Sequence, residues 1–205
     1  MRTHLVCLEM DGFAWWGHTP AIRKVTLDAK THRKILQAKL GLWLFFISQT
    51  MLFVSLIVAK GMLLGPGQPI NLSIVGPAIM TVLLIFGSIT VQLGENAVAN
   101  DRQVLLQQLL GATMLLGLGF IAGLIWVWST LPFDFSEPWG VVFFTMTGLH
   151  VLHVIIGELF LLRVMFKARA AAYTPANYWG VQGAARFWHF LGVIWLLYFF
   201  VLYIF

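Results

Sequence analysis

Residues 139–166 read WGVVFFTMTGLHVLHVIIGELFLLRVMF, and this stretch decides the fold. Its only ionisable side chains are His150, His153, Glu158 and Arg163. A helix needs roughly 20 mostly apolar residues to cross the hydrocarbon core of a bilayer. The stretch therefore predicts a membrane-spanning helix. Polar groups are costly in that position, so each of the four is a candidate for function.

Apolar stretches of similar length recur on both sides of this one. The chain has 205 residues, of which 60% are hydrophobic and 10% are charged, and its mean hydropathy is +0.85. A soluble domain carries about 25% charged residues, which excludes an ordinary soluble protein. The sequence predicts an all-α membrane protein of five transmembrane helices, at about 40–59, 73–93, 104–128, 139–166 and 184–205.

Residues 1–39 are mixed and basic, and we interpret them as a cytoplasmic N-terminal segment rather than a cleaved signal peptide. With the N-terminus inside, five spans place the C-terminus outside. Lys60 is then the only basic residue on the outer side, which fits the excess of Lys and Arg expected inside. The cytoplasmic ones are Arg2, Arg23, Lys24, Lys30, Arg33, Lys34, Lys39, Arg102, Arg163, Lys167, Arg169 and Arg186.

Several function classes are disfavoured by the residues present. The net charge of +5 sits beside the apolar spans, where it favours contact with anionic lipid rather than nucleic acid. The single cysteine, Cys7, allows neither an internal disulfide nor a cysteine-based metal site. The chain contains no nucleotide-binding loop, nucleophile elbow or zinc-protease motif.

Two of the predicted helices carry packing signals. In the second, polar residues share one narrow stripe, and we interpret them as a helix–helix hydrogen-bonding face or, alternatively, a hydrophilic path for protons or lipid headgroups. They are Thr81, Ser88, Gln92 and Glu95. In the third, Gly119 and Gly123 form a small-xxx-small pair that lets two helix backbones approach closely.

The fourth predicted helix places His150, His153 and Gly157 on one face. Two histidines three residues apart can both reach a metal ion, and Glu158 and His189 can in principle complete a ligand set. Histidines in spans more often bond to neighbouring helices or to lipid phosphates. A histidine-metal membrane enzyme therefore remains the minor alternative to a structural role.

Four segments together resemble the cytochrome c oxidase subunit III family. Residues 143–157, FFTMTGLHVLHVIIG, resemble its FFxxTGxHGxHVxxG motif, and residues 187–195, FWHFLGVIW, resemble its WHFxDxxW motif. Residues 17–21, GHTPA, and 44–49, LFFISQ, resemble stretches at the start of the family's common region. The size is similar to the short, five-helix bacterial forms, which include those of quinol oxidases.

The resemblance implies a bundle of the first two helices and the remaining three, with a V-shaped lipid cleft between the groups. It implies a non-catalytic subunit of a haem–copper terminal oxidase in the bacterial plasma membrane, in aerobic respiratory electron transport. Such a subunit packs on subunit I, contacts other oxidase subunits, binds phospholipid and supports proton uptake and translocation. Haem and copper lie in partner subunits, so this chain is expected to hold no cofactor, no metal and no active site.

Residue by residue, the resemblance carries over to five positions, which become candidates for lipid binding or packing: Gln49, His150, His153, Trp188 and His189. His18 and Lys167 are further candidates for contacts with lipid headgroups. Glu158 has no counterpart in the motif and is a possible intramembrane carboxyl, for which we favour a structural role against Arg163 or a partner subunit. Whether a proton function has moved to Glu158 stays open.

The sequence also departs from the family pattern. Gln49 stands where the family has a glutamate, and an amide cannot exchange a proton near neutral pH. Gly192 and Val151 stand where the motifs have Asp and Gly. These departures leave open a subunit III-like accessory chain of a nitric oxide reductase. The electron donor, cytochrome c or quinol, is also open.

Overall fold

The computed structural model describes residues 29–65 and 72–204, and nearly all of them lie in five long helices. Each helix is long and apolar enough to cross a membrane. The predicted all-helical fold with five membrane spans is therefore confirmed. The helices are α1 (Ala29–Leu64), α2 (Val75–Ala99), α3 (Gln103–Ser129), α4 (Pro138–Arg169) and α5 (Trp179–Tyr203).

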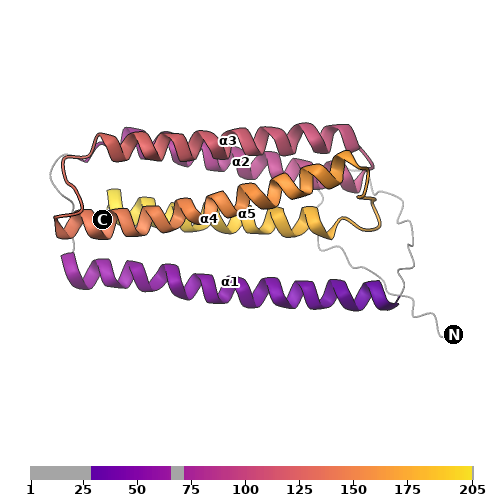
Figure 1. Cartoon of the computed structure of the whole chain (residues 1–205), viewed down its shortest axis with the longest axis horizontal. Helices are drawn as coiled ribbons and strands as arrows, with labels where there is room; N and C mark the ends of the chain where they lie inside the picture. The colour runs from indigo at the N-terminus through magenta and orange to yellow at the C-terminus, as the bar shows by residue number, and fades with distance from the viewer. Residues whose placement is uncertain (1–28, 66–71, 205) are drawn as a thin grey trace, which may run out of the picture.

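The helices run side by side with alternating direction, as Figure 1 shows. Helices α4 and α5 occupy the middle, α2 and α3 lie on one side of them, and α1 lies on the other side. Helix α1 therefore begins at one end of the bundle, and α5 ends at the other (Figure 1). This arrangement is the one expected of an odd number of spans.

The grouping of the helices differs from the expected two plus three. Among the described residues α1 packs only on α4 and α5, whereas α2 packs closely on α3 and also on α5. The physical reason lies in α2, whose small and polar residues face α3 and α5. Gly87 of α2, for example, receives the Trp188 indole of α5. The bundle is thus four packed helices with α1 attached to one side.

Small residues bring the helices of the four-helix group together. A Cβ atom at Gly123 of α3 would lie 3.2 Å from Met80 of α2, and one at Gly157 of α4 would lie 3.1 Å from Leu191 of α5. Close backbone approach is the usual way for helices to associate in lipid, where the hydrophobic effect no longer drives packing. Gly123 therefore packs as the small-xxx-small pattern predicts.

Helix α1 is longer than a span requires. Its 36 residues extend about 54 Å at 1.5 Å per residue, against a hydrocarbon core of about 30 Å. The helix begins at Ala29, well before the expected start of the span at Leu40. The extra turns carry Arg33, Lys34 and Lys39, which are good helix formers and belong in the headgroup region.

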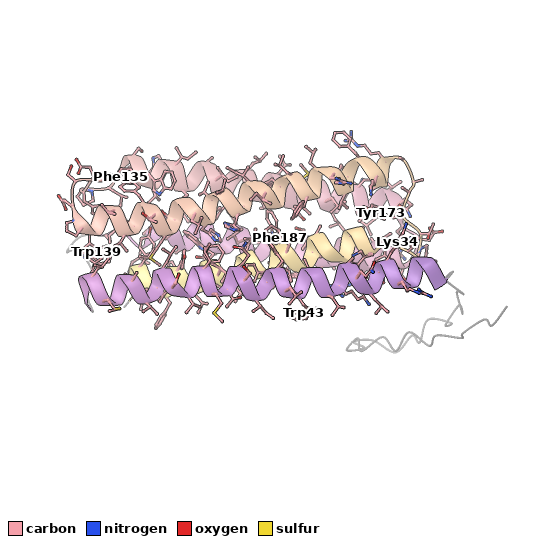
Figure 2. All side chains as sticks on the ribbon, turned by 60° about the horizontal axis from the view of Figure 1, so that its bottom comes forward. Lys34, Trp43, Phe135, Trp139, Tyr173 and Phe187 are labelled. Carbon is pink, nitrogen blue, oxygen red and sulfur yellow. The ribbon has the colours of Figure 1, made fainter. Side chains whose placement is uncertain are left out.

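Charge separates the two ends of the bundle. Lys34 and Tyr173 lie at the end where α1 begins, and Phe135 and Trp139 lie at the opposite end (Figure 2). The latter end holds the α3–α4 loop, in which the Ser136 side chain and amide hydrogen-bond to Asp134 and lower the pKa of its carboxyl. This loop therefore stays negatively charged near neutral pH.

Candidate functional site

A hydrogen bond between α1 and α4 joins two of the predicted site residues. The Nε2 atom of His153 lies 3.0 Å from the Gln49 amide, measured to Oε1, and Nδ1 lies 2.8 Å from the Leu149 carbonyl. A carbonyl only accepts, so Nδ1–H is the donor to Leu149. The neutral ring then accepts at Nε2 from the Gln49 NH₂, while a charged ring would donate to Oε1. A glutamine satisfies either state by rotating its amide.

Phe53 completes this contact and is a residue that the sequence motifs did not single out. Its ring is fully buried and meets the His153 ring edge-on, with centroids 4.9 Å apart. It also lies against Tyr198 of α5, with centroids 5.7 Å apart. Its position one helical turn after Gln49 is the signal that places both side chains on the same face of α1.

His150 occupies an aromatic enclosure in the centre of the bundle. The side chain is fully buried, and neither ring nitrogen has a hydrogen-bond partner. Rings from three helices surround it, with centroids 5.4 to 6.3 Å away: Phe53, Phe120, Trp195 and Tyr198. His150 therefore packs as an aromatic ring and does not face a neighbouring polar group of the described chain.

Glu158 lies inside the four-helix group, on the side of α4 that faces α3. It is only 8% exposed, and both carboxylate oxygens lack a hydrogen-bond partner. Its carboxyl group occupies the space that a side chain at Gly117 would fill. Trp188 of α5 closes the same space, since its Cη2 atom would lie 2.5 Å from a Cβ at Gly117.

The polar stripe of α2 forms a helix–helix hydrogen-bonding face. Trp195 Nε1–H of α5 donates to Thr81 at 3.0 Å, and His189 Nε2 lies 3.2 Å from the Gln92 amide. On the side of α2 toward α3, Thr90 and Thr113 share a hydrogen bond of 2.8 Å. His189 therefore belongs to the α2–α5 contact and not to the α4 histidines.

These placements separate the residues of the possible metal set. His153 binds Gln49, His189 binds Gln92, His150 is enclosed by aromatic rings, and Glu158 faces α3. Over residues 29–65 and 72–204, no group of three or more His, Cys, Asp or Glu side chains is positioned to hold a metal ion. The geometry does not support the histidine-metal enzyme.

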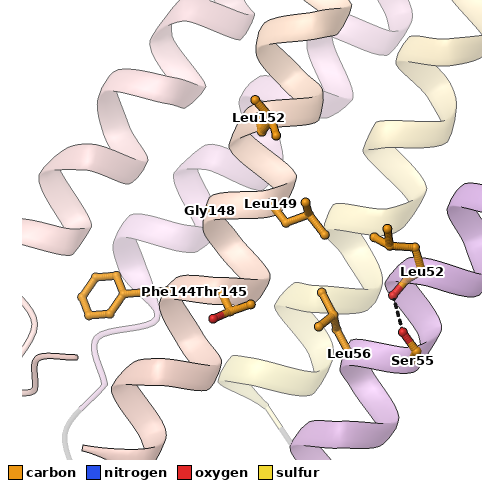
Figure 3. Close-up of a pocket in the computed structure, with 8 residues that line it drawn as sticks. All are labelled: Leu52, Ser55, Leu56, Phe144, Thr145, Gly148, Leu149 and Leu152. Carbon is orange, nitrogen blue, oxygen red and sulfur yellow. Dashed lines mark hydrogen bonds between the residues drawn. The ribbon is translucent and has the colours of Figure 1, made fainter. Parts of the chain in front are cut away.

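A groove runs between α1 and α4, as Figure 3 shows. It has a volume of about 470 Å³, and its walls are apolar apart from Ser55 and Thr145. The remaining lining residues are Leu52, Leu56, Phe144, Gly148, Leu149 and Leu152. Open, apolar walls of this kind suit a hydrocarbon chain better than a polar substrate.

The groove lies in the half of the bundle away from the basic end. Lys60 follows Leu56 by one turn of α1, is 2% exposed, and places its ammonium 5.5 Å from the Trp139 ring centroid. Lys167 lies exposed at the far end of α4 and does not line the groove. His18 lies outside the described residues.

The sequence matches the protein-family model of cytochrome c oxidase subunit III over residues 3–205. It is 32% identical over 172 residues to cytochrome c oxidase subunit 3 of Thermostichus vulcanus, covering 80% of this chain and 86% of that protein. It is 29% identical over 207 residues to the Branchiostoma lanceolatum protein of that name, covering 94% and 78%. The Synechocystis sp. protein is 29% identical over 173 residues, covering 80% and 74%.

The bundle is thus that of a multi-pass membrane protein in which several polar side chains bond from one helix to another. The chain belongs to the cytochrome c oxidase subunit III family, as the motifs at residues 143–157 and 187–195 predict. Membership places it among the membrane subunits of respiratory oxidases, in the respiratory chain and its electron transport.

Proposed function

We propose that this chain is the non-catalytic third subunit of a haem–copper terminal oxidase of aerobic respiration. The single observation that carries the proposal is the family match over nearly the whole chain, residues 3–205. Haem and copper are then held by partner subunits, with subunit I as the main contact. Large exposed apolar side chains on α1 to α5 offer surface for that contact and for lipid.

The proposed membrane is the bacterial plasma membrane, with the basic end of the bundle in the cytoplasm. Two cyanobacterial proteins are among the relatives, which supports a bacterial setting. The described basic residues other than Lys60 lie at the end where α1 begins, and Asp134 and Glu137 lie in a loop at the other end. The positive-inside rule then puts the C-terminus outside.

The proposed lipid site is the groove between α1 and α4. An acyl chain would lie along Leu52, Leu56 and Leu149, and its phosphate would draw on Lys60, one turn beyond Leu56 on α1. In this arrangement the lipid would fill the space between α1 and the four-helix group. It would therefore keep α1 in a fixed position against that group. Lys167 and His18 would contact lipid headgroups of the opposite leaflet.

Support of proton uptake by the oxidase is the third part of the proposal. Gln49 occupies the family's glutamate position and cannot exchange a proton itself. The role of this chain in proton uptake would then be indirect, because it would only provide a stable surface beside the proton entry of subunit I. This predicts that Gln49→Glu does not raise turnover, because the wild-type subunit already works without a carboxyl there.

The test uses cells that lack this chain and are complemented with the wild type or with Leu149→Trp, which fills the groove. We expect loss of oxygen consumption by membranes without the chain, and its recovery with the wild type. Leu149→Trp should restore assembly but lower the phospholipid retained by the purified complex. Leu115→Trp, on the exposed face of α3, is the control. Unchanged oxygen consumption without the chain would contradict the oxidase assignment.

A further inference from the structure

The unpartnered carboxyl of Glu158 is the feature that the proposed function does not use. The side chain is more than nine-tenths buried, and within the described residues it makes no hydrogen bond or ion pair. An ionised carboxylate without a partner is very costly in a medium of low dielectric constant, so such a group keeps its proton. Glu158 is therefore a neutral acid at rest.

No charged group from the surrounding helices faces this carboxyl. On its own helix, Arg163 is exposed and His153 points to Gln49 of α1. On α5, His189 bonds to Gln92. On α2 the one acid, Glu95, lies two turns beyond Ser88 toward the basic end, and the facing residues of α3 are uncharged.

Polar side chains of α3 lead from the basic end of the bundle toward Glu158. Gln103 donates to the Tyr173 carbonyl at 2.8 Å, and Gln107 donates to the Ala168 carbonyl at 3.2 Å, so both lie along the seam with the end of α4. Gly111, where a Cβ would lie 3.7 Å from Met165 of α4, and Gly117, which meets Glu158, continue the same seam. From Gln103 to Gly117 the rise is about 21 Å, which places Glu158 deep in the span.

One hydrogen-bond acceptor in this seam has no partner among the described residues. The Oε1 atom of Gln103 is buried and has no hydrogen-bond partner, like both oxygens of Glu158. Buried polar atoms are nearly always hydrogen-bonded, so the unsatisfied oxygens at both ends of this seam are suited to bind water.

We infer that Glu158 is a proton-binding site within the membrane span, which gains and loses its proton through the α3–α4 seam from the basic end of the bundle. In this step one proton from water joins the carboxylate to give the neutral acid, and release returns it to water. No other reactant is required. The inference stands apart from the oxidase assignment, since it concerns only side chains of this chain.

The first test is infrared spectroscopy of the full chain in lipid bilayers at neutral pH. A neutral carboxylic acid has a carbonyl stretch that a carboxylate lacks. We expect Glu158→Gln to lose one such band and Glu95→Gln, which alters a half-buried glutamate of α2, to keep it. If Glu158→Gln fails to fold, Glu158→Asp should move the band instead. A wild-type spectrum in which Glu158 contributes only carboxylate bands would overturn the inference.

The second test measures the route by transfer into heavy water, which shifts the carbonyl band of an exchanging acid. We expect the shift to be several-fold slower in Gln103→Leu and Gln107→Leu, which change the two seam residues, than in the wild type. Gln108→Leu, which changes the exposed neighbour of Gln107, should leave the rate unchanged. A band that never shifts would overturn the exchange, and equal rates in all variants would overturn the seam as its route.

Discussion

Helix α1 and the four-helix group α2–α5 are held by different means. Among its described side chains α1 buries only Phe53 and Lys60, whereas α4 buries fifteen residues. The four-helix group is joined by glycines, interior aromatic rings and several interhelical hydrogen bonds. Among the described residues α1 is joined by one side-chain hydrogen bond, Gln49 to His153, by aromatic contacts, and by Lys39 and Lys60 over tryptophan rings. Apolar length thus makes a helix a membrane span, while its small and polar residues decide which helices it packs on.

The largest expected effect comes from closing the space beside Glu158. Gly117→Ala would place a methyl group against the Glu158 carboxyl and 2.5 Å from Trp188 Cη2. Overpacking of this kind costs about 1–3 kcal/mol, and here it forces α3 away from α4 and α5. Thermal unfolding in detergent should show a clearly lower midpoint.

The matched control for that variant is Gly41→Ala in α1. A Cβ at Gly41 meets nothing within 4 Å, so the change only improves helix propensity, by about 1 kcal/mol at most. Its unfolding midpoint should be equal or higher. A drop as large as that of Gly117→Ala would show that α1 is as tightly packed as the four-helix group.

A smaller effect is expected from Phe53→Ala, which removes the buried ring of α1. The variant should loosen α1 while the α2–α5 packing remains, because the aromatic contacts of this ring are with α4 and α5. Spin-label distances between α1 and α4 should broaden, and those between α3 and α4 should not. Trp43→Ala, whose side chain is 64% exposed and points away from the bundle, is the control (Figure 2).

Gln49→Leu is expected to weaken the same contact by about 0.6 kcal/mol, the average for an interhelical hydrogen bond in a membrane. The spin-label distance between α1 and α4 should broaden slightly. Thr50→Val changes the next residue, whose hydroxyl bonds within α1 to the Phe46 carbonyl, and should have no such effect. Equal broadening in both variants would show that the Gln49–His153 hydrogen bond does not hold α1 against α4.

The smallest effect is expected at the end of α4. Ala171 has a φ of 50°, and the amide of Ala172 bonds to the Lys167 carbonyl, which is the pattern of a Schellman cap. Glycine is the favoured residue at this position, so Ala171→Gly should stabilise the chain by about 0.5 kcal/mol. The unfolding midpoint should rise slightly with no change in the α1–α4 distance. A lower midpoint would contradict the cap.

The sequence predicted the features that depend on local composition. Five apolar runs require five spans, and the Thr81–Gln92 stripe of α2 faces other helices as its spacing indicates. Pairing across helices was not predictable in the same way. Gln49 and His153 are 104 positions apart, and no periodicity connects residues on different helices.

The grouping of the helices was the prediction that proved wrong. It was based on chain order and on a family resemblance, whereas the observed packing depends on which faces carry small residues. The Trp188 indole fits against Gly87 of α2 and Gly117 of α3, and this ties α2 to α5 instead of to α1. Similarly, only the fold shows that Glu158 faces Gly117 and not Arg163.

The assignment to a terminal oxidase is tested by affinity isolation of this chain from its native membranes in mild detergent, followed by visible spectroscopy and mass spectrometry. We expect the chain to bring down a larger subunit that contains haem and copper and reduces oxygen. Isolation of the chain alone, or with a haem protein that reduces nitric oxide and lacks copper, would contradict its assignment to a terminal oxidase.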